Sequence, residues 1–290
     1  MNEVLHTYNL LIGYKGQPLI PEVNVSLCEG DIVALAGPNG SGKTTLFKTL
    51  SASIKPISGE VKLFGKDLRD YHPTERSSLF SLVLTEKPDD LFLKVFDIVA
   101  AGHYPHLGLL AKLKAEDEQI IYDSLQTVGI GHLTNRNFVS LSDGEKQKVM
   151  IAKALVQDTP IIFMDEPAAF LDYPSKIELV NIMHKLSREQ HKTILFSSHD
   201  LDLLLRHSDR LWVMAPHQPL RQGTPKQLVE QGIIDGYFKP IVAKEEFYWM
   251  FPNKPNLKTC FSGDWSNIDA HALRDNEYYG RSVEDLNDTK

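Results

Sequence analysis

Short apolar runs dominate the first 65 residues and are separated by turn residues. Four of them predict strands, because they are partly β-branched and bounded by Gly, Pro or Asn: Val4–Leu10, Val23–Leu27, Asp31–Ala36 and Val61–Phe64. A helical pattern follows the third run, from about Lys43 to Ser53. The chain therefore begins with strands and turns, with one helix set among them.

The later pattern predicts a parallel sheet. Leu79–Leu84 is one more apolar strand, and helical spacing then predominates from about Phe96 to Val156. After it, strands and helices alternate: strand 160–164, helix 175–186, strand 193–197, helix 201–207 and strand 211–214. Such alternation is typical of parallel strands joined by crossover helices.

Composition and charge exclude several classes of protein. Of 290 residues, 42% are hydrophobic and 24% charged, which is typical of a globular chain and not of a disordered or fibrous one. The 31 Lys and Arg against 38 Asp and Glu give a net charge of −7, which argues against nucleic-acid binding. Cys28 and Cys260 predict neither a disulfide framework nor a metal site. We expect no membrane span and no signal peptide, and a reducing cytoplasm as the compartment.

The composition changes after about Gly236. Ten of the 26 aromatic residues lie in residues 236–290, about twice the average density. A segment this apolar is not typical of a disordered tail. We expect a small aromatic-rich C-terminal subdomain, with a strand near Leu257–Phe261 and a helix near Asn267–Tyr278. It would pack on the rest of the chain or on a second copy, and a regulatory ligand site there is the alternative.

A phosphate-binding loop is predicted after the third strand. Gly37–Thr44 fits G-x-x-x-x-G-K-[ST] and lies between an apolar strand and a helix, the context that this motif requires. Glycines let backbone N–H groups approach phosphate oxygens, and the helix N-terminus adds partial positive charge. Lys43 would reach the β- and γ-phosphates, and the Thr44 hydroxyl would coordinate Mg²⁺. A structural glycine turn is the alternative. The expected ATP-binding residues are Gly37, Pro38, Asn39, Gly40, Ser41, Gly42, Lys43, Thr44 and Thr45.

Two carboxylates follow another apolar run. Ile161–Met164 predicts a strand buried on both faces, and Asp165 and Glu166 come directly after it, at the strand end where ligands bind in open α/β sheets. Asp165 would hold Mg²⁺ through its waters, and Glu166 would polarise the water that attacks the γ-phosphate. With Lys43 lying 122 positions earlier, the two motifs together predict ATP hydrolysis.

The segment between these motifs resembles a known family. Leu141–Gln147 reads Leu-Ser-Asp-Gly-Glu-Lys-Gln and is similar to the signature of the ATP-binding cassette family, usually Leu-Ser-Gly-Gly-Gln. The resemblance covers about residues 1–230. It implies an α/β fold with a P-loop ATPase core on a parallel sheet, an N-terminal antiparallel β subdomain and an inserted helical subdomain. The implied nucleotide-binding domain is 1–235, with the helical subdomain at about 87–157.

The signature implies a second copy of the chain. In the family, two ATP molecules lie between two cassettes, each held by the P-loop of one copy and the signature of the other. By resemblance, Asp172 in Ala169–Asp172 would contact the second copy. An ordinary capped helix start is the alternative for the signature, because Ser142 and Glu145 also fit a capping box. The implied signature contacts are Ser142, Asp143, Gly144 and Glu145.

Two further residues receive roles from the resemblance. His199, 33 positions after Glu166, is similar to the histidine that hydrogen-bonds the γ-phosphate and orients the attacking water. Glu166 and His199 are thus the expected catalytic residues. Tyr14 takes the place of the aromatic residue that stacks on adenine, and a tyrosine in the core at a strand end is the alternative.

Two positions depart from the family pattern. Glu86 stands where the family normally has a Gln that touches Mg²⁺ and senses the membrane partner. We expect Glu86 to keep that role, so the expected Mg²⁺ ligands are Thr44, Glu86 and Asp165. Asp143 replaces the first signature glycine, and we expect the signature to work through Ser142 and backbone N–H groups.

One segment points to a type of transporter. Ala100–Gly108 resembles the Gly-Arg-x-Pro-x-x-Gly stretch of ATPases that serve importers of iron–siderophore complexes, haem and cobalamin. The family's helical subdomain receives the membrane subunit in this region, and a metal site at His103 and His106 is the alternative.

The resemblance implies an ATPase subunit that uses ATP and Mg²⁺. Its implied partners are a second copy, two separate transmembrane permease subunits and, indirectly, an external substrate-binding protein. Its place would be peripheral, on the cytoplasmic face of the cell membrane. Two rival functions are a soluble cassette ATPase without a transporter, as in iron–sulfur cluster assembly, and a non-hydrolysing ATP switch.

Overall fold

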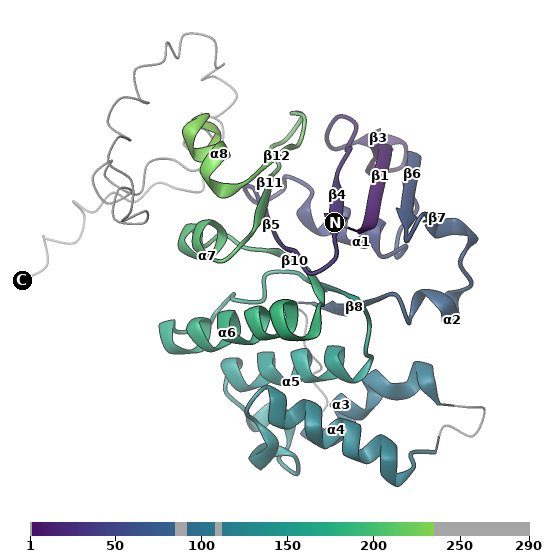
Figure 1. Cartoon of the computed structure of the whole chain (residues 1–290), viewed down its shortest axis with the longest axis vertical. Helices are drawn as coiled ribbons and strands as arrows, with labels where there is room; N and C mark the ends of the chain where they lie inside the picture. The colour runs from purple at the N-terminus through teal and green to yellow at the C-terminus, as the bar shows by residue number, and fades with distance from the viewer. Residues whose placement is uncertain (1, 85–91, 108–111, 235–290) are drawn as a thin grey trace, which may run out of the picture. The chain divides into compact units, whose positions relative to one another are not determined.

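The computed structural model describes residues 2–84, 92–107 and 112–234 (Figure 1). At its centre is a sheet with the spatial order β12-β11-β5-β10-β9-β8. The strands β11 to β8 of this order are parallel, and β12 is antiparallel to β11. In that order the strands are β12 (Arg221–Gly223), β11 (Arg210–Val213), β5 (Ile32–Ala36), β10 (Thr193–Ser197), β9 (Ile161–Met164) and β8 (Phe80–Val83).

The strands at the centre of this sheet are apolar along their whole length because both faces are covered. All residues of β5, β9 and β10 are buried, as expected for central parallel strands. Successive side chains point to opposite faces. In β5, Val33 and Leu35 join one core, whereas Ile32, Ala34 and Ala36 join the other.

An antiparallel sheet and one helix form the first of these cores. The second sheet has the order β4-β1-β6-β7 and antiparallel pairs. Helix α1 (Lys43–Leu50) contributes Leu46, Phe47 and Leu50 to the core that these strands share with β5. The strands are β1 (Glu3–Leu11), β4 (Ser26–Cys28), β6 (Ser58–Leu63) and β7 (Lys66–Asp67), and a small hairpin, β2 (Gly13–Tyr14) and β3 (Gln17–Pro18), follows β1.

Helices cover the opposite face of the central sheet (Figure 1). They are α6 (Tyr173–Gln190), α7 (Leu201–Arg206) and α8 (Pro225–Glu230). A helical segment is inserted between β8 and β9, with helices α3 (Val95–Ala100), α4 (Ala115–Thr127) and α5 (Asp143–Val156) and 3-10 turns η2 (Ala101–His106), η3 (Gly131–Leu133) and η4 (Phe138–Ser140). The 3-10 turn η1 (Leu68–Asp70) and helix α2 (Pro73–Arg76) precede β8.

Hydrogen bonds tie the helical segment to the central sheet. The Gln157 side-chain amide, at the end of α5, donates to the carbonyl oxygens of Ser77 (2.7 Å) and Phe80 (3.1 Å). His106 Nε2 lies 2.9 Å from the Gln157 carbonyl oxygen, and His103 Nε2 lies 2.9 Å from Asp117 Oδ1. Both histidines therefore have hydrogen-bonding partners in the helical segment, and the described residues contain no group of three His, Cys, Asp or Glu that could hold a metal.

The predicted fold class is confirmed: a parallel sheet carries the core, an antiparallel sheet precedes it and helices are inserted. Within the described residues, the predicted strands and helices agree with observed ones to within a few residues, whereas β2, β3, β7, β12, α2 and α8 were not predicted. Glu86 and the predicted 236–290 subdomain lie outside the described residues.

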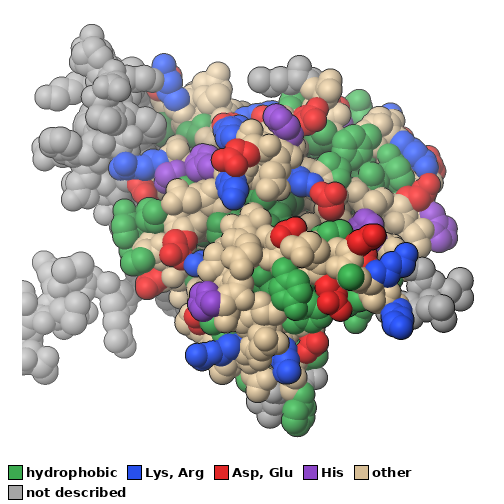
Figure 2. All heavy atoms as spheres, turned by 60° about the horizontal axis from the view of Figure 1, so that its bottom comes forward, with side chains coloured by type: hydrophobic (Ala, Val, Ile, Leu, Met, Phe, Trp, Pro, Cys, Tyr) green, Lys and Arg blue, Asp and Glu red, His purple; other side chains and the backbone are tan. Residues whose placement is uncertain are grey.

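No helix in the described part of the chain is long and apolar enough to cross a membrane. On the face shown in Figure 2, acidic and basic side chains are interspersed.

Candidate functional site

The loop between β5 and α1 has the backbone that a phosphate-binding loop requires. Gly42, directly before α1, has φ 101°, in the left-handed region that favours glycine. A Cβ on Gly37 would lie 2.5 Å from the Met214 carbonyl oxygen, so only glycine fits there. These two positions explain why the motif keeps its first and last glycines.

The N-terminus of α1 leaves donors free for an anion. Its N-cap residue, Gly42, has no side chain to accept a hydrogen bond, and no acidic residue stands in the first turn. The first N–H groups of a helix lack partners within the helix and lie at the positive end of its dipole. Ser41 Oγ beside them is buried and has no hydrogen-bond partner among the described residues. The loop therefore fits a phosphate group.

Lys43 already points back over this loop. Its Nζ donates to the carbonyl oxygens of Gly37 (2.8 Å) and Pro38 (3.2 Å). The residue is only 7% exposed, and burial lowers the pKa of its ammonium group while the charges of Glu166 and Asp165 raise it. A buried cation with replaceable carbonyl partners can turn to phosphate oxygens.

Asp165 and Thr44 come together at the carboxyl end of β9. The Thr44 hydroxyl donates to Asp165 Oδ2 at 2.9 Å, although the residues are 121 positions apart. The other carboxylate oxygen, Oδ1, accepts a hydrogen bond from the Ser197 hydroxyl at 2.7 Å. A hydroxyl and a carboxylate oxygen are hard ligands of the kind that Mg²⁺ prefers. The donor set therefore fits Mg²⁺.

Glu166 occupies a strained and partly buried position. Its φ of 50° lies in the left-handed region, where a non-glycine residue is uncommon and costs energy. Its Oε1 lies 3.9 Å from Lys43 Nζ and 2.9 Å from His199 Nε2. Burial raises the pKa of Glu166 to about 7, with Lys43 lowering it and Asp165 raising it. A carboxyl group poised near neutrality is suited to accept a proton at physiological pH.

The surroundings of His199 favour its neutral form. Partial burial and the nearby Lys43 charge lower its pKa. A neutral imidazole has one N–H donor and one acceptor nitrogen. Next to Glu166, such a group can hold a water or a phosphate oxygen without adding a second buried charge.

Tyr14 lies at the rim of the site. The residue is 51% exposed, so the alternative of a core tyrosine is wrong. The Thr45 hydroxyl donates to the Tyr14 phenol oxygen at 3.3 Å, which places the ring beside α1. An exposed ring in this position is free to stack on a flat ligand.

One pocket of about 370 Å³ collects most of these residues. It brings together the P-loop, both carboxylates and the histidine from elements that are far apart in the sequence. Leu19, which the sequence did not single out, also lines it. The lining consists of Tyr14, Leu19, Asn39, Gly40, Gly42, Lys43, Thr44, Thr45, Asp165, Glu166 and His199.

The signature residues lie outside this pocket. Among the described residues that line it, none comes from Ser142–Glu145, and Asp172 is also absent. Ser142 caps α5 as the capping box predicts: its hydroxyl donates to Glu145 Oε2 at 2.9 Å and accepts from the Glu145 N–H. That carboxylate also accepts from the Ser142 N–H, which lowers the pKa of Glu145.

The signature and the segment around Asp172 are packed against each other. A Cβ on Gly144 would lie 2.7 Å from Ser175 Oγ, so α5 and α6 meet closely at their N-termini. Asp172 caps α6 by accepting from the Ser175 N–H at 3.1 Å. One turn further along, Lys148 of α5 pairs with Glu178 of α6 at 2.6 Å. The two motifs therefore form one continuous surface, separate from the pocket.

Ser197 is a second residue of this site, besides Leu19, that the sequence analysis missed. It is fully buried, and its hydroxyl contacts Asp165 Oδ1 and the Glu166 N–H. No local sequence signal points to it, because its place depends on strand register: β10 is parallel to β9, and Phe196 is paired with Met164. The next residue of each strand is then Ser197 beside Asp165.

The raised pKa of Glu166 predicts a pH-dependent effect on stability. An acid with a pKa of 4.5 when unfolded and about 7 when folded destabilises the fold once it ionises. The penalty is absent below pH 4.5, grows between pH 4.5 and 7 and is complete above 7. Glu166→Gln is neutral throughout, so at pH 8 the nucleotide-free variant should be about 3 kcal/mol more stable than wild type.

Urea unfolding of both proteins at pH 5 and pH 8 measures this effect. We expect the difference between them to be small at pH 5 and near its maximum at pH 8. An equal difference at the two pH values would contradict the assignment of the burial penalty to Glu166.

Comparison with known proteins decides the family. The family model described as ABC transporter matches residues 20–169, which include the P-loop, the signature and both carboxylates. The chain belongs to the ABC transporter family. This family hydrolyses ATP, so the chain is an ATPase subunit.

Similar ABC proteins match along most of their length. An uncharacterised ABC transporter ATP-binding protein of Methanocaldococcus jannaschii is 36% identical, covering 80% of each chain. The ferric enterobactin transport ATP-binding protein of Escherichia coli is 32% identical, covering 78% of this chain and 83% of the relative. The iron(3+)-hydroxamate import ATP-binding protein of Bacillus subtilis is 31% identical, covering 81% and 87%.

Solved ABC structures agree with the fold. A nucleotide-free ATP-binding cassette aligns with a TM-score of 0.72 at 26% identity, over 83% of this chain and all of that one. An inward-facing structure assigned to the metal-chelate type of ABC transporter aligns with a TM-score of 0.73 at 26% identity, over 82% and 89%.

Proposed function

We propose that this chain is the ATP-hydrolysing subunit of an importer for an iron–siderophore, haem or cobalamin-like substrate. The observation that carries the proposal is the similarity, along most of both chains, to ATP-binding proteins of ferric enterobactin transport and iron(3+)-hydroxamate import. The Ala100–Gly108 resemblance points the same way.

The geometry supports a hydrolysis mechanism in which each group has one task. The α1 N-terminus and Lys43 would bind the β- and γ-phosphates. Thr44 and Asp165 would hold Mg²⁺, which would supply charge neutralisation at the phosphates. Glu166 accepts a proton from the attacking water as the water oxygen bonds to the γ-phosphorus. The bond to the ADP oxygen breaks, and His199 orients the water and the γ-phosphate. The products are ADP and phosphate.

We propose further that two copies complete each site. Within one chain, the described lining of the pocket includes no signature residue. Ser142 and the α5 N-terminus instead lie on the surface that α5 shares with the Asp172 segment. A second copy related by two-fold symmetry would present this surface to the nucleotide, and the reverse contact would follow by symmetry.

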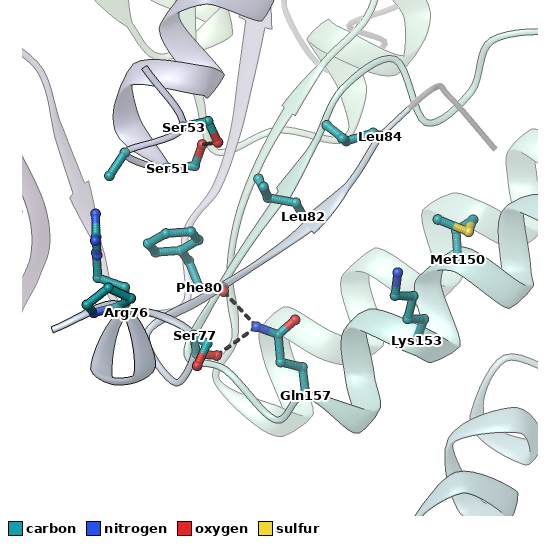
Figure 3. Close-up of a pocket in the computed structure, with 12 residues that line it drawn as sticks. Ser51, Ser53, Arg76, Ser77, Phe80, Leu82, Leu84, Met150, Lys153 and Gln157 are labelled. Carbon is teal, nitrogen blue, oxygen red and sulfur yellow. Dashed lines mark hydrogen bonds between the residues drawn. The ribbon is translucent and has the colours of Figure 1, made fainter. Parts of the chain in front are cut away.

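A second pocket supports the proposed membrane partner (Figure 3). Its volume is about 640 Å³, and α2, β8 and α5 line it, so it spans the junction of the sheet and the helical segment. Phe80, Leu82 and Met150 give it apolar walls, and Arg76 and Lys153 add positive charge. We propose that it receives a short helical segment of the permease with an apolar face and a carboxylate.

Capture from membranes tests the importer proposal. Tagged chain isolated in mild detergent should retain a polytopic protein at one-to-one stoichiometry. Lys153→Glu, which reverses one charge in the pocket, should lose that protein while keeping its basal ATP hydrolysis. Lys185→Glu, exposed on α6, is the matched control and should retain it.

Two outcomes would contradict the proposal. Retention of soluble proteins alone would indicate the cassette class that works without a transporter. Equal retention of the membrane protein by Lys153→Glu and wild type would show that the permease docks elsewhere.

A further inference from the structure

The hydroxyl of Ser197 bonds to both members of the carboxylate pair in the nucleotide pocket. Ser197 is the last residue of β10 and is fully buried. Its Oγ lies 2.7 Å from Asp165 Oδ1 and 2.8 Å from the backbone nitrogen of Glu166. One side chain thus contacts the expected metal ligand and the residue that carries the expected base.

The direction of these hydrogen bonds is determined by chemistry. A backbone N–H can only donate, so Ser197 Oγ accepts from Glu166. A carboxylate can only accept, so the hydroxyl proton of Ser197 is directed at Asp165 Oδ1. The other oxygen, Asp165 Oδ2, accepts from Thr44 at 2.9 Å. Both oxygens of the Asp165 carboxylate therefore accept hydrogen bonds. These bonds favour a single orientation of the carboxylate plane.

The bond to the Glu166 N–H supports a strained backbone. Glu166 has φ 50°, a conformation that persists only when surrounding contacts impose it. Without Ser197 Oγ, the Glu166 N–H would lose the acceptor that holds it. The cost of an unpaired buried donor would then favour another backbone conformation. The position of the Glu166 side chain beside Lys43 and His199 depends on this backbone.

We infer that Ser197 is a positioning residue for Mg²⁺-dependent ATP hydrolysis, acting through Asp165 and Glu166. This inference rests on the proposed roles of those two carboxylates. Groups that hydrogen-bond a metal ligand set its orientation, and their loss commonly costs 10–100-fold in metal affinity or activity. Ser197 also connects the Asp165–Glu166 pair to the segment that carries His199, because His199 lies two residues after Ser197 in the sequence.

Ser197→Ala is the variant that tests the inference, and Ser81→Ala is its matched control. Ser81 lies in β8 of the same sheet and is 1% exposed, and its hydroxyl has no hydrogen-bond partner among the described residues. Each variant loses one buried serine hydroxyl, but only Ser197→Ala loses the contacts to Asp165 and Glu166.

The first readout is binding, which needs no turnover. The affinity of the non-hydrolysable analogue AMP-PNP is measured in EDTA and in excess Mg²⁺ for wild type and both variants. Ser197→Ala should bind the analogue in EDTA to within about twofold of wild type. The gain in affinity that Mg²⁺ provides should fall about 10-fold, and Ser81→Ala should match wild type. The second readout is ATP turnover, which should fall about 10–100-fold for Ser197→Ala with a smaller change in KM.

The outcomes separate this inference from the proposed function. Wild-type protein without ATP turnover would contradict the proposed function. The ratio of the AMP-PNP affinity in Mg²⁺ to that in EDTA would still test the role of Ser197. A Mg²⁺ gain in Ser197→Ala equal to that of wild type would overturn the inference. An equal loss of affinity in EDTA and in Mg²⁺ would also overturn it, because that result would show a general structural role.

Discussion

Glu166→Gln should lower ATP turnover by about 10²–10⁴-fold, the contribution typical of a positioned general base. The substitution keeps the size and shape of the side chain but removes the group that accepts the proton from water. Glu166 is suited to that task because burial raises its pKa to about 7 and because its Oε1 lies beside His199. The measurement is phosphate release under saturating ATP and Mg²⁺.

The loss of turnover is specific to the chemical step if Glu166→Gln still binds nucleotide. We expect Glu166→Gln to bind AMP-PNP at least as tightly as wild type, because it removes a negative charge near the phosphates. Glu189→Gln, exposed on α6, is the control for the chemical change and should keep full turnover. Comparable phosphate release from Glu166→Gln and wild type would show that another group accepts the proton.

Lys43→Ala should weaken nucleotide binding by about 10–100-fold. Hydrogen bonds to charged groups contribute about 1.5–3 kcal/mol, and a buried ammonium at the phosphates makes more than one of them. Lys43 also holds the loop through the carbonyl groups of Gly37 and Pro38. The loop of the variant should therefore be less ordered before nucleotide arrives, and turnover should fall with affinity.

Titration with a fluorescent ATP analogue measures this loss. Lys48→Ala, five residues further along α1 and exposed, is the matched control and should bind like wild type. Binding of equal strength by Lys43→Ala and wild type would contradict the assignment of the phosphates to this loop.

Local motifs predicted much of the pocket because they combine spacing with secondary structure. The P-loop requires a strand, glycines and a helix start in that order, and all three lie where Ile32–Lys43 predicts them. Asp165 and Glu166 were predicted from the end of a buried strand. The distances between the two motifs were not predictable, because the Thr44–Asp165 contact depends on how β5, β10 and β9 lie side by side.

Ser197 was not predicted for the same reason. Its role depends on the parallel register between β9 and β10, which no local pattern encodes. The strained φ of Glu166 was also not predictable from the sequence, because local propensity disfavours that conformation and tertiary contacts impose it. The role of Glu86 and the packing of 236–290 remain predictions, since both lie outside the described residues.

Mixing two impaired variants tests the central proposal, that two copies of this chain complete each ATP-hydrolysing site. Lys43→Ala disables the P-loop, and Ser142→Arg places a large cation where the signature would meet the other copy's nucleotide. Each variant alone should have turnover at least about 10-fold below that of wild type. In a mixed dimer, one site combines the intact P-loop of one copy with the intact signature of the other.

Phosphate release from an equimolar mixture is the decisive measurement. Half of the dimers would be mixed, and each would carry one intact site of two. We therefore predict about a quarter of wild-type turnover if the sites act independently. Turnover no higher than the average of the two separate variants would contradict the account, because it would show that the P-loop and signature of different copies do not form a common site.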